Sequence, residues 1–174
     1  MKKPYFFILA TFLFSGLTLF SQKTLRGTDA EITVAGAEQV IINEQNHSLK
    51  FVVMKNNSFV EEAGHLNWLK TKVLKLNSDY DLVLYKKERD NLGYTHYRYK
   101  EIYKGIKVES GVYYVHVKDG RVISVNGEFY STISQNLSSI VPKINKTNAL
   151  NEAKLLFSAK NILDYSEKHK ELTI

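Results

Sequence analysis

The sequence predicts an α+β fold in which an amphipathic helix packs on an antiparallel β-sheet. Residues 94–103 alternate between two kinds of side chain, as a strand with two different faces does. Asp119-Gly120 separates two apolar runs, a pattern that favours a two-residue hairpin turn with positive φ. Between positions 59 and 73, apolar residues recur at helical spacing. The chain that follows the first 21 residues is long enough for one ordinary domain, or for one small domain plus a fragment.

The first 21 residues are expected to be a signal peptide. Lys2 and Lys3 precede an apolar run over residues 5–20, which is short for a membrane span. The alternative is an uncleaved N-terminal anchor. We therefore expect an exported protein, either secreted or held in the periplasm or at the cell surface.

Composition excludes several classes of function. The 174 residues contain 24 basic and 18 acidic side chains, and the basic ones are spread along the chain without a clustered tract. A nucleic-acid partner is therefore not expected. The chain has no cysteine, which excludes disulfides, thiol chemistry and cysteine-based zinc sites.

Residues 22–48 are interpreted as an N-terminal extension with a first strand. Positions 23–36 resemble loop or weak strand, whereas Val40–Ile42 and Leu49–Met54 predict two strands joined by a polar loop. A helix is expected from Ser58 to Leu76, because Ser58 and Glu61 form a capping-box pattern. Its predicted apolar stripe consists of Phe59, Ala63, Leu66, Leu69 and Val73.

Strands are expected to dominate after the helix. Residues 80–85 are rich in β-forming side chains, and residues 90–93 predict a turn. Alternation along 94–103 places Tyr97, Tyr99, Glu101 and Tyr103 on the face toward the core and His96, Arg98 and Lys100 on the opposite face. The predicted hairpin register pairs Val117 with Val122 and Val115 with Ser124. Both faces of that hairpin are largely apolar, so the face toward the helix stays open.

Residues 131–142 form a connector and are the predicted domain boundary. A second helix is expected after it, with Asn145 or Thr147 as its N-cap. Its apolar stripe comprises Ala149, Leu150, Ala153, Leu156 and Phe157. We assign residues 143–174 to an incomplete second module that contains this helix.

The segment from Gly93 to Phe129 resembles the FTP domain, the fungalysin/thermolysin propeptide domain of secreted zinc metalloproteases. The residues that carry the resemblance are His96, Arg98, Tyr99, Tyr103, Gly105, Val108, Val115, His116, Val117, Asp119, Gly120, Val125, Asn126 and Gly127. Two positions depart from the family: Glu101, where glutamine is frequent, and Lys107, where proline is frequent. On this basis residues 49–130 are assigned to an FTP-like domain.

The run PKINKTNALNEAKLLF resembles the start of a PepSY domain, the second module of many such propeptides. Together the two resemblances imply a cystatin-like α+β fold. They imply a propeptide that assists folding of a metalloprotease domain and keeps it inactive. The implied partner is that catalytic domain, in cis or in trans, and zinc would belong to it and not to this chain.

No catalytic motif accompanies these features. The sequence lacks the H-E-x-x-H motif of thermolysin-type enzymes, and its five histidines have no metal-ligand spacing. Glu62 and His65 are interpreted as a solvated pair on one helical face. The tyrosines at positions 97, 99, 103, 113 and 114 are interpreted as sheet packing. We therefore expect no enzyme activity, no cofactor and no metal ligand.

His96, Arg98 and Lys100 are the candidate partner-binding residues. The alternative is a solvent-facing strip with a cross-strand pair to an acidic residue. The first hypothesis is a propeptide module of a zinc metalloprotease precursor. The others are a free-standing periplasmic or cell-surface binding domain and a trans-acting protease inhibitor.

Overall fold

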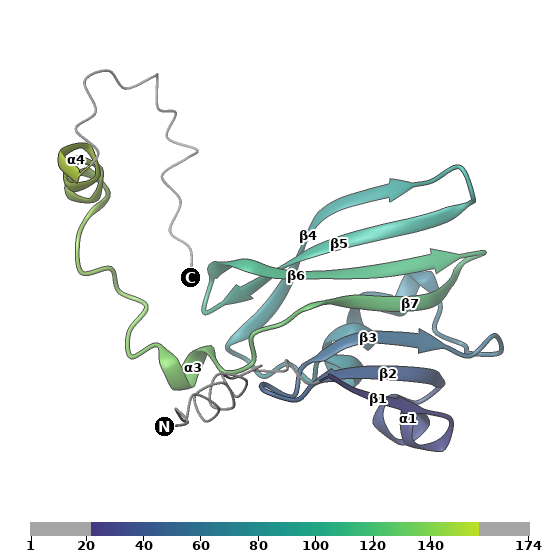
Figure 1. Cartoon of the computed structure of the whole chain (residues 1–174). Helices are drawn as coiled ribbons and strands as arrows, with labels where there is room; N and C mark the ends of the chain where they lie inside the picture. The colour runs from purple at the N-terminus through teal and green to yellow at the C-terminus, as the bar shows by residue number, and fades with distance from the viewer. Residues whose placement is uncertain (1–21, 157–174) are drawn as a thin grey trace, which may run out of the picture.

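The computed structural model describes residues 22–156 (Figure 1). The predicted signal peptide, and the part of the C-terminal module from residue 157 on, lie outside the described residues. Within the part that is described, no helix combines the length and the apolar character needed to cross a membrane.

One antiparallel sheet organises the chain, and the predicted α+β fold is confirmed (Figure 1). Its seven strands run in the order β1-β2-β3-β7-β6-β5-β4. Every neighbouring pair is antiparallel. The strands are β1 (Gln22–Arg26), β2 (Ala37–Asn43), β3 (Leu49–Met54), β4 (Tyr80–Arg89), β5 (Tyr94–Tyr103), β6 (Ile106–Lys118) and β7 (Arg121–Glu128).

A helical segment covers one face of this sheet. It consists of a 3₁₀ turn η1 (Glu62–Gly64), an α-helical turn α2 (His65–Trp68) and a π-helical turn η2 (Leu69–Val73). Leu69 and Val73 are buried in the shared core. The predicted amphipathic packing of a helix on a sheet is therefore present, in a helix that is shorter than expected.

The expected start of this helix at Ser58 is wrong. The Val60 carbonyl accepts a hydrogen bond from the Val122 N–H at 2.8 Å, and the Glu62 N–H donates to the Gly120 carbonyl at 2.8 Å. This pairing with the β6–β7 hairpin keeps the preceding segment extended, so the helix begins only at Glu62. Phe59, expected in the apolar stripe, is instead 83% exposed.

Alternation along β5 places the side chains as predicted. Tyr97, Tyr99, Glu101 and Tyr103 are buried on the face that carries the helix. Tyr113 in β6 is buried with them, whereas Tyr114 is only partly buried, as its alternate position in the strand requires. The interpretation of Tyr114 as part of the same packing is thus corrected.

The Asp119-Gly120 turn forms as predicted, with φ values of 50° and 72°. Val117 pairs with Val122, but Val115 pairs with Val125 because a bulge interrupts the ladder. The predicted pairing of Val115 with Ser124 is therefore wrong by one residue. The bulge turns both Val122 and Val125 toward the core.

The first part of the chain is more ordered than expected. Residues 23–36, expected as loop or weak strand, contain β1 and the short helix α1 (Thr28–Thr33). Ala30 and Val34 anchor this part because both are buried in the same core as the strands of the FTP-like segment. The sheet is continuous across residue 48, since β2 pairs with β3.

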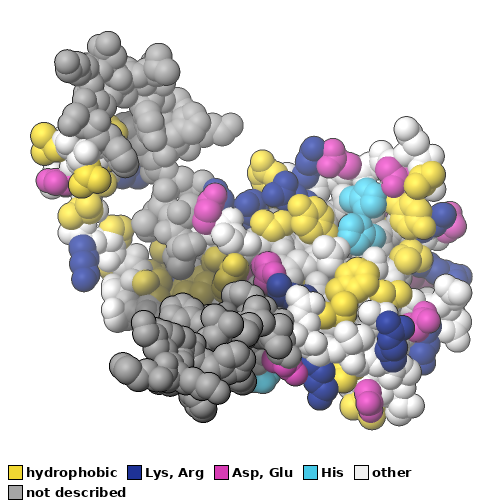
Figure 2. All heavy atoms as spheres, viewed as in Figure 1, with side chains coloured by type: hydrophobic (Ala, Val, Ile, Leu, Met, Phe, Trp, Pro, Cys, Tyr) yellow, Lys and Arg dark blue, Asp and Glu magenta, His cyan; other side chains and the backbone are white. Residues whose placement is uncertain are grey.

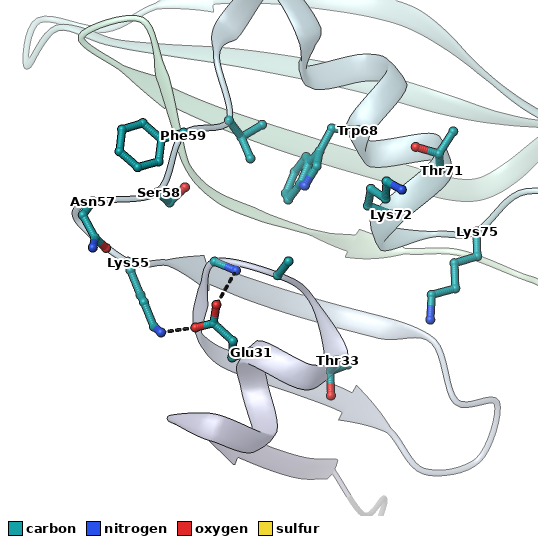
Figure 3. A pocket seen from close by; sticks show the side chains of 13 residues that line it. Glu31, Thr33, Lys55, Asn57, Ser58, Phe59, Trp68, Thr71, Lys72 and Lys75 are labelled. Carbon is teal, nitrogen blue, oxygen red and sulfur yellow. Dashed lines mark hydrogen bonds and ion pairs between the residues drawn. The ribbon is translucent and has the colours of Figure 1, made fainter.

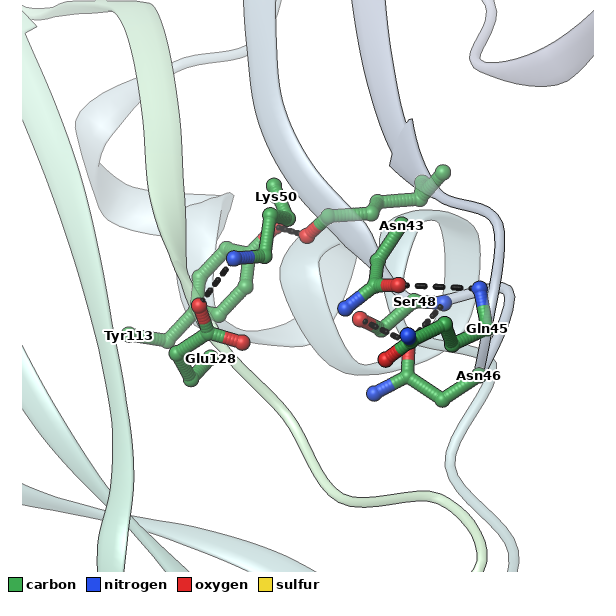
Figure 4. A network of polar contacts seen from close by, with 8 residues as sticks. Asn43, Gln45, Asn46, Ser48, Lys50, Tyr113 and Glu128 are labelled. Carbon is green, nitrogen blue, oxygen red and sulfur yellow. Dashed lines mark hydrogen bonds and ion pairs between the residues drawn. The ribbon is translucent and has the colours of Figure 1, made fainter. Parts of the chain in front are cut away.

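Local hydrogen bonds form the polar loop between β2 and β3 (Figure 4). The Asn43 side-chain oxygen accepts from the Gln45 N–H at 2.9 Å. The Asn46 side-chain oxygen accepts from both the N–H and the hydroxyl of Ser48, at 3.0 and 2.7 Å. Such Asx turns favour a tight reversal of the backbone, which explains why the loop lies where it was predicted.

Two short helices follow the sheet, α3 (Ile133–Asn136) and α4 (Lys146–Leu156). Asn145 rather than Thr147 caps α4, because its side-chain oxygen accepts from the Asn148 N–H at 2.8 Å. Figure 1 shows α4 apart from the sheet, and none of its described residues is buried. The described residues of the apolar stripe predicted for this helix are therefore not buried against another element, and Phe157 lies outside the described residues.

Candidate partner-binding face

The face of β4–β7 that lies away from the helix carries all three predicted site residues. We define the outer face by Tyr85, Tyr94, His96, Arg98, Lys100, Tyr114, His116, Lys118 and Asn126. Figure 2 shows histidine side chains here beside hydrophobic and basic ones. The pairing of β5 with β6 brings these side chains together, because His96 lies opposite His116 and Arg98 lies opposite Tyr114.

Arg98 lies between two aromatic rings. Its guanidinium carbon is 5.2 Å from the centre of the Tyr85 ring and 5.6 Å from that of Tyr114. No hydrogen bond or ion pair joins Arg98 to any residue in the described range 22–156, and its Nε is buried without a partner there. The rings therefore fix a cation whose donors have no acceptor within this part of the chain.

His96 and His116 form a chain of polar contacts across β5, β6 and β7. Their two Nδ1 atoms lie 2.7 Å apart. The Nε2 of His96 lies 3.2 Å from Asp90 Oδ2, and the Nε2 of His116 lies 2.6 Å from Asn126 Oδ1. The acidic partner of His96 therefore comes from the β4–β5 turn and not from a neighbouring strand, as the alternative of a cross-strand pair had expected.

Lysines add positive charge along the outer face. Lys118 Nζ lies 4.4 Å from the centre of the Tyr94 ring, and Lys100 Nζ lies 5.6 Å from that of Tyr85. Lys100 also donates a long hydrogen bond of 3.4 Å to the Glu109 carbonyl. The chemistry of the face is therefore aromatic and basic, which suits an acidic partner surface.

The β5 residues His96, Arg98 and Lys100 of the outer face were predicted from the sequence, but most of its other residues were not. Tyr85, Tyr114 and His116 were not assigned to it. The alternation of β6 placed Tyr114, His116 and Lys118 on one side of the strand. Only the β5–β6 pairing reveals that this side adjoins Arg98 and His96.

The opposite face holds a polar cluster of a different kind. His65 is buried, its Nε2 lies 2.6 Å from the Tyr99 hydroxyl, and its Nδ1 contacts the Glu62 carbonyl. The interpretation of Glu62 and His65 as a solvated pair is therefore wrong for His65. The Tyr97 hydroxyl donates to the Glu62 carboxylate, and this bond lowers the pKa of Glu62. Burial raises the pKa of Tyr99 to about 12.

Glu101 is a carboxyl group enclosed in the core. It is 1% exposed, and burial raises its pKa to about 7. One oxygen accepts from the Tyr130 N–H at 3.0 Å, and the other has no partner within residues 22–156. The space for this carboxyl exists because position 111 is glycine: an added Cβ would lie 2.5 Å from Glu101 Oε2.

A second surface feature is a groove of about 830 Å³ between α1, the segment after β3 and the helix (Figure 3). Trp68 and Phe59 supply its apolar part, and Lys72 and Lys75 line it as well. Glu31 pairs with Lys55 at its edge. All its lining residues lie between positions 31 and 75.

No group of three or more metal-ligating His, Cys, Asp or Glu side chains occurs within residues 22–156. The H-E-x-x-H motif is absent from the whole sequence.

Comparison with known families tests the resemblance found in the sequence. Residues 80–129 match the family described as Fungalysin/Thermolysin Propeptide Motif. The match begins with β4, ends just after β7, and so contains every strand that builds the outer face. It does not reach the C-terminal module, whose PepSY assignment stays a prediction. The resemblance is confirmed for these strands: residues 80–129 of the chain form a fungalysin/thermolysin propeptide motif.

Proposed function

We propose that this chain is a propeptide module of an exported thermolysin-type metalloprotease precursor. It binds the protease domain through the outer face and contributes no catalytic group. The propeptide motif at residues 80–129 supports this function because such motifs occur in propeptides of fungalysin- and thermolysin-type proteases. Export would follow from the N-terminal signal peptide.

The surroundings of Arg98 are the observation on which the proposal depends most. A guanidinium presents five donors in a planar fork that matches a carboxylate. The rings of Tyr85 and Tyr114 hold this fork in place, and no residue in the described part of the chain accepts from it. A carboxylate of the protease domain would supply the missing acceptor and form a charge-assisted pair.

The composition of the outer face fits a binding role. Tyrosine and arginine are the side chains that most often dominate the binding energy of protein interfaces. The groove is the weaker candidate for protease recognition, because its lining residues lie outside the matched propeptide motif. The outer face, in contrast, is built almost wholly by the motif.

Binding alone would give both activities of a propeptide. A module that binds the folded protease and not the unfolded one stabilises the folded state by mass action. The same contact can cover the active-site cleft and inhibit the enzyme. Residues 131–142 would then act as a linker to the PepSY-like segment 143–174, and the cystatin-like topology would serve as the scaffold.

An inhibition assay in trans tests the proposal. Purified residues 22–174 are added to a thermolysin-type protease, and peptide hydrolysis is measured. We expect inhibition by the wild-type chain and an inhibition constant about tenfold higher or more for the double variant Arg98→Ala/Lys100→Ala.

The matched control is Lys23→Ala/Arg26→Ala, which removes the same charge from β1 at the far edge of the sheet. It should inhibit like the wild type. Equal weakening by both double variants would show a nonspecific charge effect and contradict the assignment of the outer face. No inhibition by the wild-type chain would favour a free-standing binding domain.

A further inference from the structure

The two histidines of the outer face have a donor arrangement that a bound cation would fit. Asp90 Oδ2 and Asn126 Oδ1 are acceptors, and each faces the Nε2 atom of one histidine. When each Nε2 carries the hydrogen of that contact, a neutral imidazole leaves its Nδ1 as an unprotonated acceptor. The two Nδ1 lone pairs face each other across 2.7 Å.

Two lone pairs at that separation repel unless a cation lies between them. A transition-metal ion is a cation that two imidazole nitrogens can share. We propose that His96 and His116 form a cross-strand site for a divalent transition-metal ion of the zinc, nickel and copper class, bound through both Nδ1 atoms. Imidazole nitrogen suits these ions.

The distances allow such an ion with a small adjustment. Two nitrogens bound to a tetrahedral zinc ion at about 2.0–2.1 Å each lie about 3.3 Å apart. The observed separation is 2.7 Å, so the rings need to open by about 0.6 Å. The two residues stand directly opposite each other on β5 and β6, so side-chain rotation alone can supply this change.

Neighbouring side chains hold the rings of His96 and His116 in the way that the outer shell of a metal site does. Metal-bound histidines usually donate their other N–H to a carboxylate or carbonyl oxygen, which fixes the tautomer and the ring orientation. Asp90 and Asn126 occupy these positions. The Tyr94 ring stacks on His96 with an interplanar angle of 10°, and Tyr114 stacks on His116 with an angle of 1°.

The remaining coordination positions would be open to water. Within residues 22–156 no third His, Cys, Asp or Glu side chain converges on the pair. The side chain of His96 is 33% exposed, so an ion can enter from solvent. The expectation that the chain holds no metal ligand rested on histidine spacing along the sequence. Strand pairing brings together two histidines that are 20 positions apart.

Isothermal titration of NiCl2 into the full, untagged chain at near-neutral pH tests this site. We expect saturable binding of one ion per chain. His96→Gln and His116→Gln should each raise the dissociation constant about tenfold or more, and Asp90→Asn should raise it by about tenfold, the usual effect of an outer-shell change. A control variant with His47→Gln and His169→Gln should bind like the wild type.

The proposal is overturned if the wild type shows no saturable binding. It is also overturned if either single histidine variant binds unchanged, or if the control variant loses binding. Far-UV circular dichroism and urea unfolding in EDTA check that the variants are folded.

A measurement on the wild-type chain does not depend on the variants. Titration with ZnCl2, followed by long-range ¹H–¹⁵N spectra of the imidazole rings, should shift the Nδ1 resonances of His96 and His116 far more than their Nε2 resonances. Shifts confined to Nε2, or to other histidines, would contradict coordination through Nδ1.

Discussion

The two faces of strands β5 and β6 carry similar side chains and differ in what those side chains contact. Tyr97, Tyr99, Tyr103 and Tyr113 on the inner face are at most 7% exposed. On the outer face, Tyr85 of the neighbouring strand is 62% exposed. Aromatic content alone therefore does not separate the core of this protein from its candidate binding surface.

The contacts of the polar atoms do distinguish the core from the candidate binding surface. On the inner face, the Tyr113 hydroxyl donates to the Leu49 carbonyl at 2.6 Å, and the Tyr99 hydroxyl bonds His65. On the outer face, the rings contact the cations of Arg98 and Lys118. Changes on the inner face should therefore lower stability, whereas changes on the outer face should lower binding.

The largest effect is expected from Gly127→Ala, because an added Cβ in β7 would meet the backbone of β6. Gly127 has a φ of 159°, and an added Cβ would lie 2.2 Å from the Val112 carbonyl oxygen and 2.7 Å from Tyr113 Cα. These are backbone atoms, so the strands themselves must separate. We expect a loss of about 4 kcal/mol or more in the free energy of unfolding, measured by urea denaturation.

Gly93→Ala is the matched control for this prediction. Gly93 also has a positive φ, of 84°, but an added Cβ would meet nothing within 4 Å. Gly93→Ala should therefore lower the free energy of unfolding only through the unfavourable backbone conformation, by about 1–2 kcal/mol. Similar losses for the two variants would mean that backbone strain, and not the close approach of the strands, explains Gly127.

The next largest effect on stability is expected at Glu101, the carboxyl group enclosed on the inner face. The pKa of Glu101 is raised to about 7 by burial, whereas an unfolded glutamate titrates near 4.3. Between these values the folded state binds more protons than the unfolded state, so stability falls as pH rises through this window. Above it, the full penalty of burying the charge remains.

Glu101→Gln should remove this penalty. We expect the variant to be more stable than the wild type by on the order of 3–4 kcal/mol at about pH 8, and to differ little from it at about pH 4. Glutamine is also the residue that is frequent at this position in the family. A difference in stability between the variant and the wild type that does not grow between these pH values would show that Glu101 is solvated in the folded protein.

Side-chain alternation explains why much of both faces could be predicted from the sequence. The period of two in β5 placed Tyr97 and Tyr99 inward and Arg98 outward, and the Asp119-Gly120 turn fixed the start of the hairpin register. These signals are local: each depends on residues that are neighbours along one strand or turn.

The errors arose where distant backbone groups compete with local preference. Ser58 has the sequence of a helix cap, but Val60 and Glu62 bond the tip of the β6–β7 hairpin instead, about 60 residues further along the chain. The bulge in β7 left no clear mark in the sequence and shifted the partner of Val115 by one position. The contact between His96 and His116 depends on the same nonlocal pairing.

A smaller effect on stability should distinguish Tyr99, on the inner face, from Tyr114, on the outer face. Tyr99→Phe removes the hydroxyl that bonds the Nε2 of buried His65 and leaves that nitrogen unpaired. We expect a loss of about 1–3 kcal/mol in the free energy of unfolding. Tyr114→Phe removes a hydroxyl that bonds no described residue, so its effect should be within about 0.5 kcal/mol. Equal losses in urea denaturation would remove the distinction between the two faces.

A smaller effect on stability than that of Tyr99→Phe is expected from Tyr85→Ala on the outer face. The ring is 62% exposed and contacts Arg98 and Lys100 through cation–π interactions. Such contacts contribute about 0.5–1 kcal/mol at exposed sites, so the urea midpoint should change little. Inhibition of a thermolysin-type protease should nevertheless weaken, because the Arg98 guanidinium loses one of the two rings that orient it. Tyr85→Phe keeps the ring and should restore inhibition. If Tyr85→Ala instead destabilised the fold while leaving inhibition intact, the outer face would be part of the structural core and Arg98 would need no fixed orientation to act.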